Sequence, residues 1–173
     1  MIELEKTYLI KDLPKNLKGC KFKEIIDIYI PKSSNHSKLR IRKDGDKFEM
    51  TKKEPVCGKD SSCQREQTIV LTDVEFNALN KIKGKRIHKL RYHYDYNGRT
   101  AEIDVFQDLL KGLVLVDFEF VTLKEKDNFR MPNFCLANVT QEVFVAGGVI
   151  CGKSYKDIKN DLNRFSYRKL FFK

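Results

Sequence analysis

Apolar and polar residues alternate with a period of two along most of the chain, which is the pattern of β-strands. Segments rich in β-branched and aromatic residues predict eight strands, over 2–10, 23–30, 37–43, 46–53, 64–71, 87–96, 99–106 and 113–121. Asp44-Gly45-Asp46 and Asn97-Gly98 have the composition of tight hairpin turns. We therefore expect an α+β protein that is mainly β, built as an eight-stranded antiparallel β-barrel with a few outer helices.

Helical patterns are fewer and shorter than the strand patterns. A helix is expected from Thr72 to Gly84, because Thr72 and Glu75 have the spacing of a capping box and glycine commonly ends a helix. A second short helix is expected near Thr140.

The rest of the chain shows no boundary between domains. Residues 124–138 have little periodicity and contain Pro132, so they are expected to form a loop. Neither repeats nor a linker are evident, and we predict a single domain over 1–173 that ends in a basic helix over 154–173.

Charged residues of like sign stand two positions apart in five of the predicted strands. The pairs are Glu3 and Glu5, Arg40 and Arg42, Lys89 and Arg91, Glu102 and Asp104, and Asp117 and Glu119. Residues i and i+2 of a strand point to the same side, so each pair lies on one face of its strand. One interpretation is a half-exposed sheet whose charges face water.

The segregation of acids and bases favours a second interpretation, an inside-out barrel with a polar lumen. Carboxylates bind Mg²⁺ or Mn²⁺ as hard oxygen ligands, and arginine and lysine bind phosphate oxygens. Lys53 and Glu66 continue the pattern on the fourth and fifth strands. The sequence thus predicts a lumen that holds both metal cations and a polyanion.

The net charge of +10, from 34 Lys+Arg against 24 Asp+Glu, also favours a polyanionic partner. Nucleic acid is the broader alternative, supported by the basic residues after Lys153, but such residues usually face water on an amphipathic helix, and we consider nucleic acid an unlikely partner. No apolar run reaches the roughly 18 residues that a membrane span needs, so we expect a cytoplasmic protein. The oligomeric state stays open, with a dimer as one alternative.

Residues that commonly bind metal or catalyse reactions in other proteins are scattered here. The five cysteines lack CxxC spacing, which disfavours a zinc site, and reduced thiols are favoured over a pair between Cys57 and Cys63. His36, His88 and His93 lie apart in the sequence and are expected on the surface or in the barrel wall.

Taken together, these segments resemble the CYTH family, also called triphosphate tunnel metalloenzymes. Residues 3–9, ELEKTYL, are similar to the family's ExExK opening, and seven further segments follow in the family's order: 39–42, 51–53, 65–66, 89–92, 102–106, 112–120 and 138–140. The resemblance implies an eight-stranded antiparallel tunnel. Two positions depart from the family pattern, because Thr7 stands at the signature lysine and Asp117 at a glutamate.

The resemblance implies metal-dependent hydrolysis of inorganic triphosphate or a nucleoside triphosphate, with Mg²⁺ or Mn²⁺ as cofactor. The expected phosphate-binding residues are Arg40, Arg42, Lys53, Lys89 and Arg91, and the expected metal ligands are Glu3, Glu5, Asp104, Asp117 and Glu119. Catalytic roles are expected for Glu3, Glu5, Glu66 and Arg91. Two alternatives stay open: a class IV-type adenylate cyclase, and a protein that only binds polyphosphate or a nucleotide, which the uncharged Thr7 favours.

Overall fold

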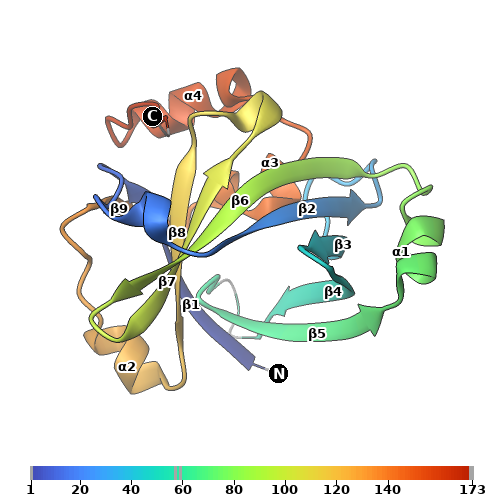
Figure 1. Ribbon diagram of the computed structural model, residues 1–173, viewed down its shortest axis with the longest axis horizontal. Helices are drawn as coiled ribbons and strands as arrows, with labels where there is room; N and C mark the ends of the chain where they lie inside the picture. Colours follow the sequence, from blue (N-terminus) through green and yellow to red (C-terminus); the bar gives the residue numbers. More distant parts are fainter. Residues whose placement is uncertain (1, 57, 59, 172–173) are drawn as a thin grey trace.

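The computed structural model, which describes residues 2–56, 58 and 60–171, contains nine strands and several short helices in that part of the chain (Figure 1). In the described residues the strands are β1 (Ile2–Ile10), β2 (Phe22–Ile30), β3 (Leu39–Asp44), β4 (Lys47–Pro55), β5 (Cys63–Leu71), β6 (Lys85–Tyr96), β7 (Arg99–Phe106), β8 (Val114–Phe120) and β9 (Cys135–Asn138). The first eight correspond to the eight strands that alternation predicts, with ends that differ by at most two residues.

The sheet closes on itself. Its strand order is β5-β4-β3-β2-β6-β7-β8-β1-β9, every described pairing is antiparallel, and β1 also pairs with β5. That closing pairing is short, because it runs from Ile2 opposite Arg65 to Leu4 opposite Cys63. Farther along the same edge of β1, β9 takes the place of β5. The eight-stranded antiparallel barrel is therefore confirmed, with β9 as an additional strand.

Apolar side chains cover the outer wall of the barrel, as the alternation predicts. Phe76 of helix α1 (Asp73–Leu79) packs with Ile28 and Ile41 of β2 and β3. On the other side, the Phe129 ring lies against Phe118 of β8, with 4.6 Å between their centroids. These contacts leave the opposite faces of the same strands for the lumen.

One end of the lumen is filled with apolar side chains. Strand residues there, including Tyr29, Phe106 and Leu115, pack against Val145 and Ile150. The latter two belong to the helical turns η3 (Val143–Val145) and α3 (Gly147–Ile150), and helix α4 (Tyr155–Asn163) packs behind them. In Figure 1, α4 lies at the upper end of the barrel and the N-terminus at the lower end. The lumen is therefore polar over part of its length only, and residues 139–162 form an apolar plug.

Several predicted helix boundaries are wrong. Helix α4 ends at Asn163, because the Ser166 backbone has a positive φ of 55° and the described chain beyond it has no regular structure; the predicted helix over 154–173 is too long. The helix that follows Thr72 ends at Leu79, so Gly84 does not end it. Gly84 instead allows a close approach to β2, because an added Cβ would lie 2.9 Å from the Tyr29 carbonyl oxygen.

The segment 124–138 is not the loop that its weak periodicity predicts. It contains most of helix α2 (Leu123–Asn128) and the four residues of β9. The sequence does contain a cue for α2, since the Thr122 side chain caps it by accepting from Glu125 N. The helix expected near Thr140 is found as the turns η3 and α3, which begin at Val143.

In the plug, Gly148 lies in close contact with the backbone of Ser37, and a larger residue at this position is expected to destabilise the protein. A Cβ at Gly148 would lie 2.0 Å from the backbone oxygen of Ser37, so Gly148→Ala forces the two segments apart. We expect the free energy of unfolding to fall by about 1–3 kcal/mol. Urea denaturation measures this change. Gly19→Ala is the matched control, because a Cβ at Gly19 meets no atom within 4 Å, and an equal loss in both variants would contradict the contact.

Candidate functional site

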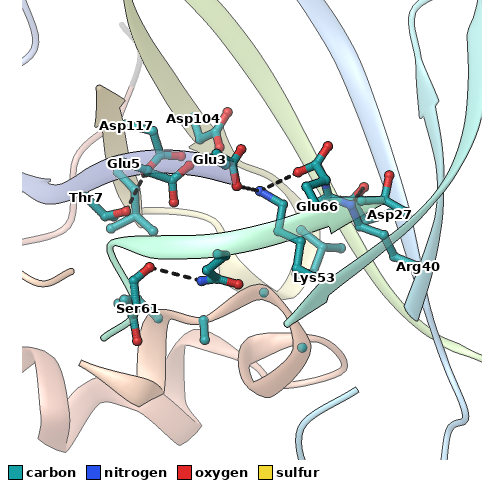
Figure 2. A pocket seen from close by; sticks show the side chains of 18 of the residues that line it. Glu3, Glu5, Thr7, Asp27, Arg40, Lys53, Ser61, Glu66, Asp104 and Asp117 are labelled. Atoms are coloured by element: carbon teal, nitrogen blue, oxygen red, sulfur yellow. Dashed lines mark hydrogen bonds and ion pairs between the residues drawn. The ribbon is translucent and has the colours of Figure 1, made fainter. Parts of the chain in front are cut away.

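The polar part of the lumen is a cavity of about 600 Å³ that receives side chains from all eight barrel strands. It brings together every residue to which the sequence assigns a role, together with Glu102 of the same pattern. These residues are Glu3, Glu5, Arg40, Arg42, Lys53, Glu66, Lys89, Arg91, Glu102, Asp104, Asp117 and Glu119. Figure 2 shows side chains from several strands pointing into the cavity, among them Glu5 of β1, Asp27 of β2, Lys53 of β4 and Asp117 of β8.

The acidic pairs and the basic residues of the sequence pattern occupy different arcs of the barrel, although β2, β3, β4 and β5 also carry the lining carboxylates Asp27, Asp44, Glu49 and Glu66. The acidic pairs lie on β7, β8 and β1, which are consecutive in the sheet order. Basic residues lie on the adjacent strands β4 and β3. They also lie on β6, which is separated from β3 by β2. Because the barrel is closed, the acidic arc faces the basic arc across the cavity. A ligand that combines cations with a polyanion matches this division of charge.

At the border between the arcs, Asp104 of β7 pairs with two cations of β6. Arg91 donates from Nε and Nη2 to the two carboxylate oxygens, at 2.7 Å each, and Lys89 donates a short hydrogen bond to the same side chain. Burial alone would raise the pKa of Asp104, but Arg91 and Lys89 outweigh it and lower the pKa to about 2. Asp104 therefore stays ionised and holds both cations at the cavity wall.

Asp27 on β2 is a lining residue that the sequence reasoning did not single out. Its side chain is 1% exposed and accepts two hydrogen bonds from Arg42, at 2.6 Å from Nε and 2.9 Å from Nη2. Arg40 Nε lies 3.9 Å from the same carboxylate and has no hydrogen-bond partner among the described residues. Burial would raise the pKa of Asp27, yet Arg42 and Arg40 hold it well below its usual range. Asp27 thus orients Arg42 through two hydrogen bonds and provides a counter-charge to Arg40.

The positive charges near the acidic arc do not fully balance its carboxylates, and three of these carboxyl groups have raised pKa values. Burial and then Asp117 raise the pKa of Glu5 to about 8. Burial raises the pKa of Asp117 as well, with repulsion from Asp104 as the next cause, and the pKa of Glu119 rises through burial and Glu102. Each shift combines partial loss of solvent with repulsion from neighbouring carboxylates, and both disfavour the ionised form.

Thr7, which stands at the family's lysine position, lies within this acidic group. Its hydroxyl donates to Asp117 Oδ1 at 2.7 Å, and the two residues are paired across β1 and β8. The backbone N–H of Thr7 donates to Thr140 Oγ1 at 3.0 Å. Thr7 therefore supplies a hydrogen bond to the acidic arc but no positive charge.

The acidic arc fits a divalent cation by its chemistry. Among the described residues, no three His, Cys, Asp or Glu side chains already converge in a preformed metal site. The crowded carboxylates of Glu5, Asp117 and Glu119 nevertheless offer hard oxygen donors and lack positive charge, which Mg²⁺ or Mn²⁺ would supply. Small movements of these side chains would be needed to complete the coordination.

The histidines divide between the cavity and the outer wall. His36 lines the cavity beside Ser37 and Lys38, which the sequence did not anticipate. His88 lies on the outer side as expected, where its two ring nitrogens are 3.1 Å from Glu24 and from Asp108. Cys57 lies outside the described residues, so the possible pairing of Cys57 with Cys63 is not described.

The raised pKa values predict how the stability of the metal-free protein depends on pH. A carboxyl whose pKa is higher in the folded than in the unfolded state binds its proton more tightly when folded, so stability falls as pH rises towards the folded pKa. For Glu5 that fall extends up to about pH 8. We expect a lower thermal midpoint at pH 8 than at pH 6.5 in the presence of a chelator, and recovery with Mn²⁺. An unchanged midpoint, or the same slope in Glu5→Gln, would contradict the assignment.

The chain belongs to the CYTH family, because the family's sequence model, described as the CYTH domain, matches residues 1–132. The barrel and its charged lumen agree with the triphosphate tunnel architecture that the motifs predict. Comparison with curated protein sequences finds no significant match. Among the described residues, no helix has both the length and the apolar character needed to cross a membrane.

Solved structures share the fold at low sequence identity. The inorganic triphosphatase NE1496 is 22% identical with a TM-score of 0.62, over 87% of this chain and 95% of that one. A protein of Pyrococcus horikoshii OT3 is 18% identical with a TM-score of 0.53, over 96% of this chain and 91% of that one. A putative adenylate cyclase of Bacillus halodurans is 15% identical with a TM-score of 0.53, over 99% and 93% of the respective chains. At these identities the likeness shows the fold alone.

Proposed function

We propose that this protein hydrolyses a triphosphate, either inorganic triphosphate or a nucleoside triphosphate, with the help of Mg²⁺ or Mn²⁺. The observation that carries the proposal is the opposition of a basic and an acidic arc across one cavity of about 600 Å³. Membership of the CYTH family supports it, as does the fold shared with a protein described as an inorganic triphosphatase.

The basic arc would bind the phosphate chain. Arg40 and Arg42 lie on the same face of β3, and a guanidinium can donate two parallel hydrogen bonds to phosphate oxygens. Lys53, Lys89 and Arg91 add charge from β4 and β6. Phosphoryl transfer spreads negative charge over the transferred group, so catalysis would consist mainly of positioning and electrostatic stabilisation by these side chains.

The acidic arc would hold the cation and orient water. The proposed metal ligands are Glu3, Glu5, Asp104, Asp117 and Glu119. A bound Mg²⁺ or Mn²⁺ would neutralise phosphate charge and make a coordinated water more acidic. Glu66 would orient a water near the phosphate chain, and its contacts with Lys53 at 2.9 Å and with the donating Thr68 hydroxyl at 2.8 Å support this role.

Adenylate cyclisation is the alternative reaction, favoured by the fold shared with a putative adenylate cyclase. Cyclisation needs a place for the base, and stacking on an aromatic ring is a common solution. Among the described residues that line the cavity, the rings of Tyr29 and Phe106 are nearly fully buried in the plug contact, and His36 carries the one exposed aromatic ring. This arrangement favours hydrolysis. A binding-only protein is the further alternative, since Thr7 supplies no charge.

The test is a phosphate-release assay on the wild-type chain with inorganic triphosphate, ATP, GTP and pyrophosphate, each with Mg²⁺, Mn²⁺ or a chelator. We expect release from at least one triphosphate, none from pyrophosphate, and loss of activity in the chelator. Formation of cyclic nucleotide and pyrophosphate from ATP would favour the cyclase. Tight binding of triphosphate without any release would leave the binding-only protein.

A further inference from the structure

Lys53 on β4 is shared between carboxylates of two other strands. Its Nζ lies 2.9 Å from Glu66 Oε2 on the adjacent strand β5. It also donates a short hydrogen bond to Glu3 on β1, next to the place where β1 and β5 close the barrel (Figure 2). Burial would lower the pKa of Lys53, but Glu5 and Glu3 raise it above its ordinary range, so the ammonium stays charged. In the absence of ligands, Lys53 therefore neutralises part of the negative charge on the acidic strand β1.

This ion-pair cluster is partly accessible to solvent, unlike the pair of Arg42 and Asp27. The side chains of Lys53, Glu3 and Glu66 are 23%, 17% and 24% exposed. The pair of Arg42 and Asp27, by comparison, is 8% and 1% exposed. Separating an enclosed pair leaves an uncompensated buried charge, whereas a partly exposed lysine on a flexible stem separates at lower cost. Of Lys53 and Arg42, Lys53 is therefore the cation whose ion pairs separate at the lower cost.

We propose that Lys53 is an internal counter-ion of Glu3, which a divalent cation replaces when Lys53 turns to the phosphate chain. The inference rests on the proposed function, because it takes a triphosphate and a divalent cation as the two ligands of the cavity. Phosphate draws Lys53 away from Glu3 and frees an oxygen ligand for the cation. The cation in turn releases Lys53 to the phosphate.

The exchange makes the two ligands bind with positive coupling. By linkage, the factor by which triphosphate tightens cation binding equals the factor by which the cation tightens triphosphate binding. Couplings between sites are commonly 5- to 150-fold. Part of this coupling comes from direct contact between the cation and the phosphate oxygens. The part due to Lys53 is the difference between the wild-type protein and a variant without the ammonium group.

The test measures binding of Mn²⁺ by electron paramagnetic resonance, with and without the hydrolysis-resistant analogue imidotriphosphate. Lys53→Met keeps the aliphatic stem and removes the charge. We expect phosphate-free Lys53→Met to bind Mn²⁺ about 10-fold more tightly than the wild type, and imidotriphosphate to tighten Mn²⁺ binding by a correspondingly smaller factor. Lys53→Gln provides the same comparison if the methionine variant does not fold.

Two control variants separate a specific exchange from a general change of charge. Arg40→Met removes one positive charge from the same lumen, but from a side chain that faces Asp27. Lys52→Met changes the next residue, which is half exposed and pairs with Glu54. We expect each control to change Mn²⁺ affinity by less than about 3-fold. Equal tightening in Lys53→Met and Arg40→Met, or no tightening in Lys53→Met, would overturn the proposal.

Failure of this inference is distinguishable from failure of the proposed function, because phosphate release is not its readout. If the Lys53 variants show the expected change while the wild type releases no phosphate, the counter-ion role stands and hydrolysis is contradicted. If the wild type hydrolyses triphosphate but the Lys53 variants match the Arg40 control, only the counter-ion role is contradicted.

Discussion

Replacing Glu5 by glutamine is expected to reduce phosphate release at least about 100-fold, the scale on which losing one electrostatic contact at a reaction centre acts. Glutamine keeps the shape of the side chain but removes the charge that a divalent cation needs. The same substitution is expected to raise the thermal midpoint of the metal-free protein at pH 8. Glu5 is half-buried beside Asp117 and its pKa is raised to about 8, so its ionised form destabilises the fold.

The opposite signs of the two effects make this a sharp prediction. A variant that is inactive because it is misfolded would lose stability, whereas Glu5→Gln should gain it. Glu54→Gln is the matched control, because Glu54 lies outside the cavity lining and pairs with Lys52 at 3.1 Å on the exposed side of β4. Activity and midpoint of the control should stay close to the wild type. Full activity in Glu5→Gln would remove Glu5 from the proposed site.

Replacing Asp27 by alanine is expected to lower the free energy of unfolding by about 3–5 kcal/mol, the cost of leaving one partner of a buried ion pair alone. Arg42 is 7% exposed and loses both of its hydrogen bonds to Asp27 in this variant. Arg40, which faces the same carboxylate at 3.9 Å, loses its counter-charge as well. Urea denaturation followed by circular dichroism measures the loss.

Two comparisons make the Asp27 result interpretable. The double variant Asp27→Ala and Arg42→Met removes both charges, and it should recover part of the stability because no buried guanidinium is left alone. Surface substitutions such as Glu54→Gln should change stability by less than about 1 kcal/mol. An Asp27→Ala protein as stable as the wild type would contradict the view that Asp27 anchors the arginines of β3.

The charged lumen could be predicted from sequence because the direction of a strand side chain is a local property. Glu102 and Asp104 share a face in any extended strand, whatever the strand pairs with. The acidic and basic pairs therefore indicated the lining of a cavity before any pairing of strands was known. The family motifs added the order of the strands and the ligand that we propose for the lumen.

Asp27 escaped the sequence reasoning for a physical reason. Five of the other lumen strands carry two like charges two positions apart. Asp27 has no such partner, because its neighbours on the same face of β2 are Ile25 and Tyr29. Its partners Arg42 and Arg40 come from β3 and are brought to it by strand pairing. A lone carboxylate among apolar residues of a strand is a cue in hindsight, because a buried acid requires a partner.

The apolar plug also depends on contacts that are distant in sequence. Tyr29 and Leu115 lie on the lumen faces of their strands. They belong to the same apolar cluster as Ile150, which comes more than thirty residues later in the sequence. Alternation predicts a face and does not predict what fills it. For the same reason the four residues of β9 could not be distinguished from a loop, since their pairing with β1 defines them as a strand.

Whether this charged lumen hydrolyses a triphosphate is measured most directly by a ³¹P NMR time course of inorganic triphosphate and ATP with the wild-type protein and Mg²⁺ or Mn²⁺. We expect the resonances of at least one substrate to decline while orthophosphate and the corresponding diphosphate appear in equal amounts, and we expect Glu5→Gln to show neither change. Intact substrates after prolonged incubation with the folded wild type, or equal breakdown by Glu5→Gln, would contradict the proposed hydrolysis.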